Sequence, residues 1–193
     1  MTLILASKSQ SRAAMLRAVD VPFDTIAADV DERAIEAEMQ GARPDQIALA
    51  LAEAKALAID SDDALVLGSD SLVVVGDQRF DKPASREEAT EHLRAFSGRV
   101  MMLHSAAAIA RAGEVVWRHS AIASLHMREL SDEFIASYLD AEWPEVGQCV
   151  GVFRIETRGP QLFDRIEGDH FTVLGMPLLA VLGALRELGQ LPA

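Results

Sequence analysis

The chain has 193 residues, of which 50% are hydrophobic, and carries a formal net charge of -12. This composition suits a folded domain with a sizeable core, whereas the negative charge argues against nucleic acid or an anionic membrane as a partner. The single cysteine, Cys149, excludes an intrachain disulfide. No apolar run is long enough to span a bilayer, and the first residues lack a signal-peptide pattern. We therefore expect a cytoplasmic protein.

The amino-terminal stretch predicts a strand, a serine-rich turn and a helix. Thr2–Ala6 is a short apolar run, and Ala13–Val19 has helical apolar spacing. The first turn of such a helix attracts phosphate, and serine hydroxyls together with the guanidinium of Arg12 would add hydrogen-bond donors. Ordinary helix capping by Ser9 or Ser11 is the commoner role of such serines, so the stretch alone leaves both interpretations open.

The next elements are a strand over Phe23–Ala27, an acidic turn at Asp29–Glu32 and a helix over Pro44–Ile59. The acidic turn fits either a solvated loop or a contact with a metal or a substrate. Lys55 lies in an alanine-rich part of the helix, where a lysine is usually only solvated.

The central stretch places polar residues inside buried strand sequence. Ala64–Leu67 and Leu72–Val75 are runs rich in β-branched residues, which indicates strands covered on both faces. Asp70 lies between them, and a buried carboxylate must be hydrogen-bonded, paired or bound to a metal. Gly68 permits another group to approach closely, and Lys82 follows Asp70 by twelve residues. These residues suit a metal-bound polyanionic ligand; alternatively, Asp70 caps a turn between two strands and Lys82 is solvated.

The second half predicts further helices and strands. Ser85 begins a helix with capping-box spacing, and a turn at Arg111–Glu114 joins two strands into a hairpin. The five histidines lack the short pair spacing of a zinc site. The remaining candidate residues are acids, lysines, one arginine and serines, and this set favours metal-assisted phosphate chemistry over covalent catalysis. The predicted elements are helices over 85–96, 131–139 and 177–188, and strands over 100–110, 115–126, 149–155 and 161–166, with Glu156 and Arg158 at the last turn.

Several stretches, taken in order, resemble one known family. They are LILASKSQSR, Asp31-Glu32, Ala54-Lys55-Ala56, GSDSLVV with Asp81-Lys82-Pro83, Phe96-Ser97-Gly98-Arg99 and IEGDHFTVLGMPL. Together they are similar to the Maf family of nucleoside triphosphate pyrophosphatases, over essentially the whole chain.

This resemblance implies a single Maf-like domain over 1–193, with an α/β fold of the Maf/ITPase-like kind. Such a fold has an elongated mixed β-sheet flanked by helices, and two lobes with a central cleft. The resemblance also implies a homodimer that hydrolyses a nucleoside triphosphate to the monophosphate and pyrophosphate with a divalent cation, Mg²⁺ or Mn²⁺. A nucleotide-binding regulator of cell division with little catalysis is the alternative, because Ala13 stands where family members often have a second arginine.

The resemblance also implies the site residues. Asp70 matches the catalytic aspartate, and Asp70 with Glu32 would hold the metal. Glu156 matches a glutamate of the branch that acts on 7-methyl-GTP, and a carboxylate can accept two hydrogen bonds from guanine. The residues expected to bind substrate are Ser7, Ser9, Ser11, Arg12, Lys55, Ser71, Lys82 and Glu156.

Overall fold

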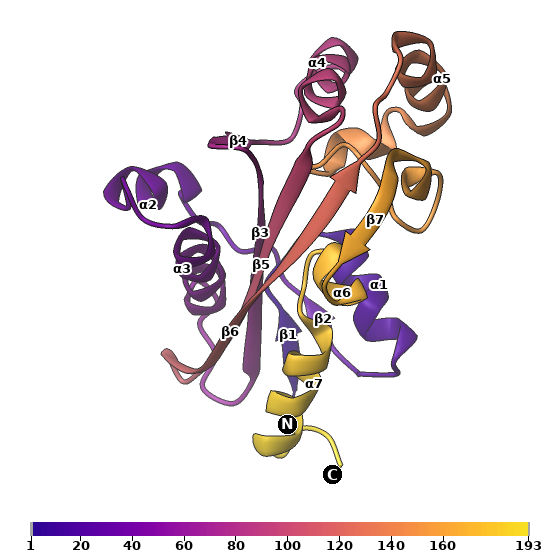
Figure 1. Ribbon diagram of the computed structural model, residues 1–193. Coiled ribbons are helices and arrows are strands. Elements are labelled where there is room, and N and C mark those ends of the chain that lie inside the picture. Colours follow the sequence, from indigo (N-terminus) through magenta and orange to yellow (C-terminus); the bar gives the residue numbers. More distant parts are fainter. Residues whose placement is uncertain (1, 193) are drawn as a thin grey trace. The chain divides into compact units, whose positions relative to one another are not determined.

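The computed structural model describes residues 2–192 and is an α/β fold (Figure 1). Its seven strands pair in the order β2-β1-β3-β5-β6-β7, with β4 beside β3. The chain divides into two compact units: the first comprises the residues up to Ser71, His104–Ala121 and the residues from Asp169 on, and the second comprises Leu72–Leu103 and Ile122–Gly168. The expected mixed sheet flanked by helices is confirmed.

The first unit is built on parallel strands. β1 (Leu3–Leu5) pairs in parallel with β2 (Asp24–Thr25) on one side and with β3 (Leu65–Val75) on the other, where Leu5 lies opposite Leu67. β3 is a single strand, so the two apolar runs predicted as separate strands are continuous through the polar residues between them. The interpretation of Asp70 as the cap of a turn is therefore wrong.

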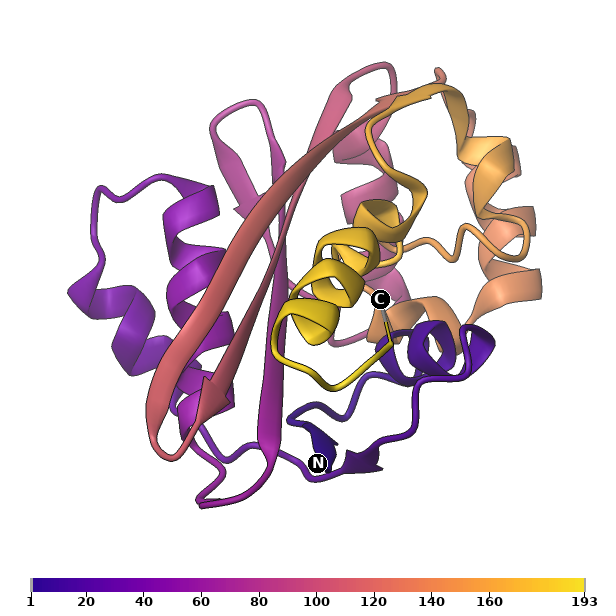
Figure 2. The same ribbon diagram turned by 90° about the horizontal axis from the view of Figure 1, so that it is seen from below.

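Two sets of helices cover the sheet of the first unit. α1 (Gln10–Ala18) and α7 (Leu178–Glu187) pack on one face, where they share a buried apolar core with Leu3, Leu5, Leu65 and Leu67. α3 (Pro44–Leu57) packs on the other face, preceded by α2 (Glu32–Glu38) (Figures 1 and 2). Since side chains alternate along a strand, the two faces of β3 present different residues to these two sets.

The second unit combines short strands with two longer helices. It contains β4 (Gln78–Phe80), α4 (Arg86–Phe96), α5 (Asp132–Glu142) and β7 (Phe163–Glu167). Ser85 caps α4 by accepting a hydrogen bond from the Glu88 amide at 3.2 Å, and Glu88 Oε2 reaches back to the Ala84 amide at 2.7 Å. The predicted start of α4 is thus confirmed, although Glu88 bonds the residue before the cap.

Two long strands pass through both units. β5 (Val100–Arg111) and β6 (Glu114–Met127) are joined by a two-residue turn in which Ala112 and Gly113 both have positive φ, 48° and 76°. This is the backbone geometry that matches the twist of a tight hairpin, and it confirms the predicted turn.

Two predictions about local structure need correction, and some short elements were not predicted. Glu32 does not lie in a turn, because Asp31 accepts a hydrogen bond from the Ala34 amide at 3.0 Å and begins α2. Residues 149–155 form no strand, because Val152 has a left-handed φ of 54° that breaks an extended backbone. The short helix α6 (His170–Val173) and β4 were not predicted.

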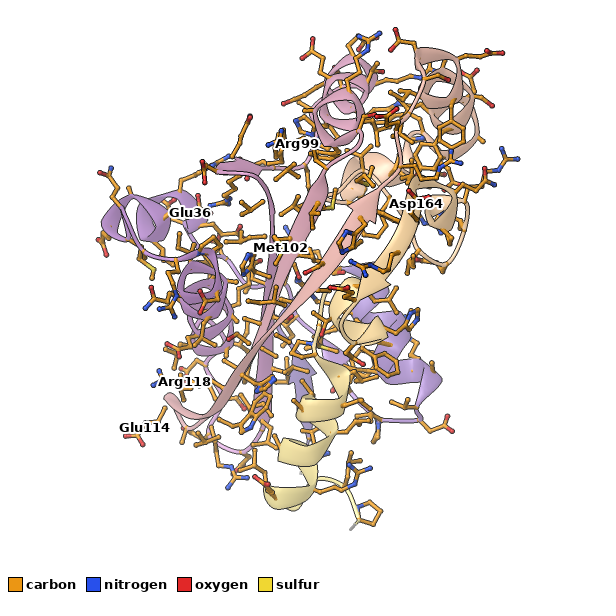
Figure 3. All side chains as sticks on the ribbon, in the orientation of Figure 1. Glu36, Arg99, Met102, Glu114, Arg118 and Asp164 are labelled. Atoms are coloured by element: carbon orange, nitrogen blue, oxygen red, sulfur yellow. The ribbon has the colours of Figure 1, made fainter. Side chains whose placement is uncertain are left out.

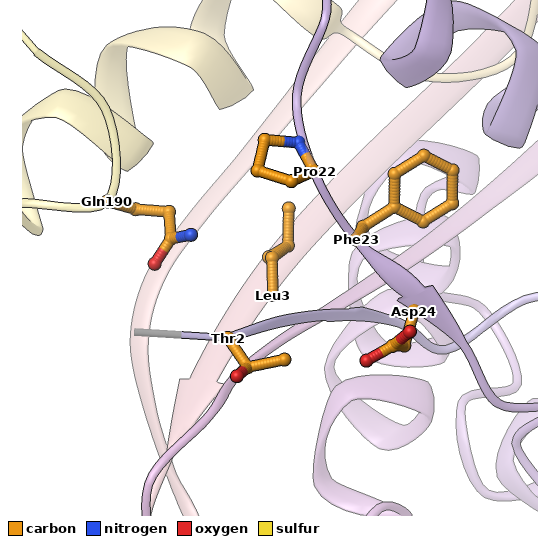
Figure 4. A pocket seen from close by; sticks show the side chains of 6 residues that line it. All are labelled: Thr2, Leu3, Pro22, Phe23, Asp24 and Gln190. Carbon is orange, nitrogen blue, oxygen red and sulfur yellow. The ribbon is translucent and has the colours of Figure 1, made fainter.

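A pocket of about 290 Å³ lies beside β1 in the first unit (Figure 4). It contains none of the predicted site residues, and its lining residues are Thr2, Leu3, Pro22, Phe23, Asp24 and Gln190. Among residues 2–192, no helix has the length and apolar character needed to cross a membrane.

Candidate active site

Arg12 is the centre of a polar cluster at the start of α1. Its guanidinium donates hydrogen bonds to the Gly175 carbonyl at 3.0 Å, to Ser71 Oγ at 3.2 Å and to Ser7 Oγ at 3.4 Å. All three acceptors are neutral, and within residues 2–192 no carboxylate lies within ion-pair distance of this guanidinium. Burial lowers the pKa of Arg12, and the negative charges of Asp70 and Glu32 act in the opposite direction. A partly buried cation of this kind is suited to receive an anion.

The predicted serines take different roles around Arg12. Ser9 caps α1, because its Oγ accepts a hydrogen bond from the Arg12 amide at 3.4 Å. Ser11 donates to the Leu174 carbonyl at 3.1 Å. Ser7 is buried, and its Oγ also accepts a hydrogen bond from the Ser9 amide at 3.1 Å. Capping is therefore confirmed for Ser9, and Ser11 ties α1 to the segment after α6.

The carbonyl of Gly175 collects several donors, which sequence reasoning missed. Besides Arg12, it accepts hydrogen bonds from Ser71 Oγ at 2.9 Å and Ser69 Oγ at 3.3 Å. Gly175 has a φ of 99°, and a Cβ there would lie 3.2 Å from Ser71 Oγ, so this close approach favours glycine. Ser105 Oγ lies 3.0 Å from Ser71 Oγ and extends the network. The spacing of Ser69 and Ser71 by two residues on β3 was the sequence signal that could have placed both hydroxyls on one face of the strand.

A second cluster joins Lys55 to two carboxylates. Lys55 Nζ lies 2.5 Å from Asp70 Oδ1 and 2.9 Å from Glu32 Oε1. The Lys55 and Asp70 side chains are only 13% and 11% exposed, whereas Glu32 is 47% exposed. Lys55 is therefore not one of the solvated lysines that are usual on a helix, because it forms a mostly buried ion pair with Asp70.

Gly68 explains how Lys55 comes so close to β3. A Cβ at Gly68 would lie 2.1 Å from the Ala52 carbonyl oxygen and 2.5 Å from the Ala56 amide nitrogen of α3. Only glycine leaves room for the helix backbone at this position. The close approach predicted for Gly68 is confirmed, and the approaching group is the backbone of α3.

The two clusters lie on opposite faces of β3. Ser69 and Ser71 point toward the α1 side, and Asp70 points toward α3, as strand alternation requires. β1 ends at Leu5, opposite Leu67, so it does not accompany β3 past that residue. The ends of parallel strands are where ligands bind in α/β sheets, and here groups from both faces reach such an end.

The remaining predicted residues, Lys82 and Glu156, belong to the second unit, and both are exposed. Arg154 Nε lies 3.8 Å from Glu156 Oε1. Burial and the charge of Glu156 raise the pKa of the Cys149 thiol, while the charges of Lys82 and Arg154 act to lower it. Glu156, Lys82 and Arg154 therefore all lie within electrostatic reach of Cys149.

The loop that carries Glu156 is fixed to α5. Thr157 Oγ1 donates a 2.7 Å hydrogen bond to Glu142, a buried carboxylate, and the Tyr138 hydroxyl donates to the Val152 carbonyl at 3.1 Å. A Cβ at Gly159 would lie 2.3 Å from the Arg154 carbonyl oxygen. The loop is thus held at both ends while Glu156 is left exposed.

The Lys55 cluster also fits a divalent cation. Asp70 and Glu32 already direct carboxylate oxygens at one positive group, and Mg²⁺ usually takes one or two carboxylates together with waters and phosphate oxygens. Within residues 2–192, no three His, Cys, Asp or Glu side chains gather as a metal site. The donor set therefore suits a cation whose coordination is completed by a phosphate ligand.

A family model and full-length relatives both match this chain over nearly its whole length. The family described as "Maf-like protein" matches residues 2–188. The chain is 48% identical to a protein of Rhizobium meliloti named 7-methyl-GTP pyrophosphatase, over 99% of this chain and 98% of that protein. It is also 48% identical to a protein of Sphingopyxis alaskensis named nucleoside triphosphate pyrophosphatase, over the full length of both. The solved Ham1 protein of Staphylococcus aureus shares the fold, with a TM-score of 0.50 and 17% identity over 95% of this chain and 99% of that one.

Proposed function

The chain belongs to the Maf-like protein family, and on this basis we propose that it hydrolyses a nucleoside triphosphate to the monophosphate and pyrophosphate. One observation carries the proposal: among residues 2–192 the Arg12 guanidinium is hydrogen-bonded only to neutral groups, and Asp70 lies on β3 beyond the end of β1. A site with an unneutralised cation and a mostly buried acid suits a phosphoanhydride that must be bound and attacked by water.

In this mechanism Asp70 accepts the proton of the attacking water. The water oxygen forms a bond to the α-phosphorus, the bond from that phosphorus to the bridging oxygen breaks, and pyrophosphate leaves. Lys55 holds the Asp70 carboxylate in place through its 2.5 Å contact. Arg12 and Lys82 supply positive charge to the phosphate oxygens, and the hydroxyls of the α1 segment supply further donors.

Asp70 and Glu32 are the residues that would hold Mg²⁺ or Mn²⁺. When bound, such a cation stabilises negative charge on phosphate oxygens. Lys55 now occupies the position between the two carboxylates, so the position of its ammonium group is expected to depend on the cation.

Glu156 supports 7-methyl-GTP as the substrate. Its exposed carboxylate can accept hydrogen bonds from the N1–H and the exocyclic amine of guanine, and it would attract a positively charged methylated base. The relatives from Rhizobium meliloti and Mesorhizobium japonicum carry the name 7-methyl-GTP pyrophosphatase. We also propose that the enzyme is cytoplasmic and homodimeric.

The alternative of a regulator with little catalysis depended on Ala13. In this chain the Ala13 side chain is 5% exposed and packs in the apolar core of the first unit. The position therefore contributes to packing, and its lack of an arginine does not argue against catalysis.

The test is pyrophosphate release from 7-methyl-GTP, GTP, UTP and dTTP with Mg²⁺ or Mn²⁺. We expect release, fastest with 7-methyl-GTP; preference for UTP or dTTP would contradict the role of Glu156 only. Folded protein that shifts its melting temperature with nucleotide but releases no pyrophosphate would favour the regulator, and release of orthophosphate would indicate a plain phosphatase.

Asp70→Asn tests the catalytic residue. The amide keeps the shape of the side chain and removes its charge, so we expect turnover to fall by about 10²-fold or more, because a general base contributes about 10²–10⁴-fold. Asp77→Asn is the matched control, since Asp77 is exposed in the turn before β4. Full turnover by Asp70→Asn would refute the role of Asp70.

A further inference from the structure

The first part of β6, Glu114–Ala121, has an open edge in the first unit. β5 pairs with one side of β6, and β7 pairs with the other side only along Ser124–Met127. Within residues 2–192, no loop or helix forms a backbone hydrogen bond to Glu114–Ala121. A long edge strand with unpaired backbone groups is a template for pairing with another strand.

The tight hairpin determines which backbone groups face this edge. In a two-residue hairpin, Arg111 and Glu114 flank the turn and form the first hydrogen-bonded pair. Bonding to β5 then alternates along β6. The amide and carbonyl groups of Val115, Trp117 and His119 are therefore directed away from β5.

The edge also presents a shallow hollow of mixed polarity. It has a volume of about 280 Å³, and its described lining residues are Val115, Val116, Trp117 and Arg118. Val116 is 43% exposed, and Glu114 and Arg118 project from the hairpin end of β6 (Figure 3). Arg118 is already oriented, because its Nη1 lies 2.8 Å from Glu53 Oε1 of α3, which leaves further guanidinium N–H groups for a second carboxylate.

The sequence of this edge is complementary to itself in one antiparallel register. With a two-fold axis at Val116, Glu114 lies opposite Arg118 twice, Val115 lies opposite Trp117 twice, and Val116 meets its own copy. In this register Val115 and Trp117 form the hydrogen-bonded pairs. Shifting the axis to Arg118 would place two arginines opposite each other, and like charges directly opposite are destabilising.

We propose that two copies of this chain pair antiparallel through Glu114–Arg118 of β6, with the axis at Val116. The proposal assigns an interface to the homodimer proposed above and does not depend on the enzymatic activity. The paired segment is electrically neutral, while the whole chain carries -12, so two copies repel each other at long range. Because salt screens exposed charges beyond about 8 Å at physiological ionic strength, dimerisation should strengthen when salt is raised from a low concentration.

The test is sedimentation equilibrium of the full chain and of charge variants. Glu114→Lys places a lysine opposite Arg118 in both symmetric pairs, and Arg118→Glu places two glutamates opposite each other. We expect each variant alone to dimerise about tenfold more weakly, since both symmetric cross-strand charge pairs change from attraction to repulsion. Mixing the two variants restores both attractive pairs, so the mixture should form a heterodimer.

Two further variants separate the interface from general effects. Val116→Lys places two positive charges at the axis and should abolish dimerisation. Leu179→Lys changes another exposed apolar residue, which is 62% exposed on α7, and should leave dimerisation unchanged. A wild-type chain that stays monomeric at its highest soluble concentration would overturn the proposal, and so would charge variants that dimerise like the wild type or fail to recover on mixing.

Discussion

Lys55→Met removes the cation that two carboxylates share. Lys55 Nζ contacts both Asp70 and Glu32, and methionine has a similar length without a charge. The substitution leaves Asp70 as a carboxylate that is 11% exposed and has lost its ion-pair partner.

The burial of the partners determines the size of the effect. Removing one member of a buried ion pair costs about 3–5 kcal/mol, because the other charge stays buried and uncompensated. The slight exposure of Lys55 and Asp70 places Lys55→Met near the lower end, about 3 kcal/mol. Glu32 is 47% exposed, and exposed pairs contribute about 0–1 kcal/mol, so Glu32→Gln should cost less than about 1 kcal/mol.

Urea unfolding at pH 7, followed by circular dichroism, measures these free energies. Lys55→Met combined with Asp70→Asn should be more stable than Lys55→Met alone, since the second change removes the uncompensated charge. Mg²⁺ or Mn²⁺ should raise the melting temperature of Lys55→Met, because the two carboxylates then face no ammonium group. A Lys55→Met variant that loses no more stability than Glu32→Gln, or a double variant less stable than Lys55→Met, would show that Asp70 does not depend on Lys55 for charge compensation.

Two other predictions follow from the packing of the first unit. Gly68→Ala should lower the free energy of unfolding by at least about 2 kcal/mol, since its Cβ would overlap the backbone of α3. Gly183 lies in open space on α7, so Gly183→Ala should raise the free energy of unfolding by about 0.5–1 kcal/mol. Equal effects of the two substitutions in urea unfolding would contradict this prediction. Burial lowers the pKa of His104 from 6.5, and the charge of Asp45 only partly opposes it. The unfolded chain therefore takes up this proton first, and stability falls as pH drops below about 6.5. Between pH 7 and pH 5.5, the free energy of unfolding of His104→Gln should fall by up to about 1 kcal/mol less than that of the wild type. An identical fall in both proteins would exclude His104 as a source of the pH dependence.

Local signals in the sequence located many elements of the fold. Ser85 and Ser131 mark the starts of α4 and α5, and each accepts the expected amide hydrogen bond. The turn before Glu114 closes the hairpin as predicted. Each of these features depends on interactions between residues within four positions of one another, so a short stretch of sequence is enough to predict it.

The same locality explains the errors. Val152 lies in an apolar run that predicts a strand, but its backbone is left-handed and its own carbonyl accepts a hydrogen bond from the Tyr138 hydroxyl. Glu32 appeared to be part of an acidic turn because α2 has no buried residue and therefore no apolar stripe in the sequence. The Val152 conformation involves a contact with a residue 14 positions away, which local propensity does not record, whereas α2 lacks the apolar periodicity that would have marked it as a helix.

The sequence by itself determined the order of the motifs, β1, α1, α3 and α7 of the first unit, and the residue types of the candidate site. The tertiary structure alone decided their partners. Arg12 meets the Gly175 carbonyl 163 residues away, and Lys55 meets Asp70 across the contact that Gly68 permits. Such pairings arise because side-chain alternation on β3 sends Ser71 to one helix layer and Asp70 to the other, and only the packed sheet specifies which helix covers each face.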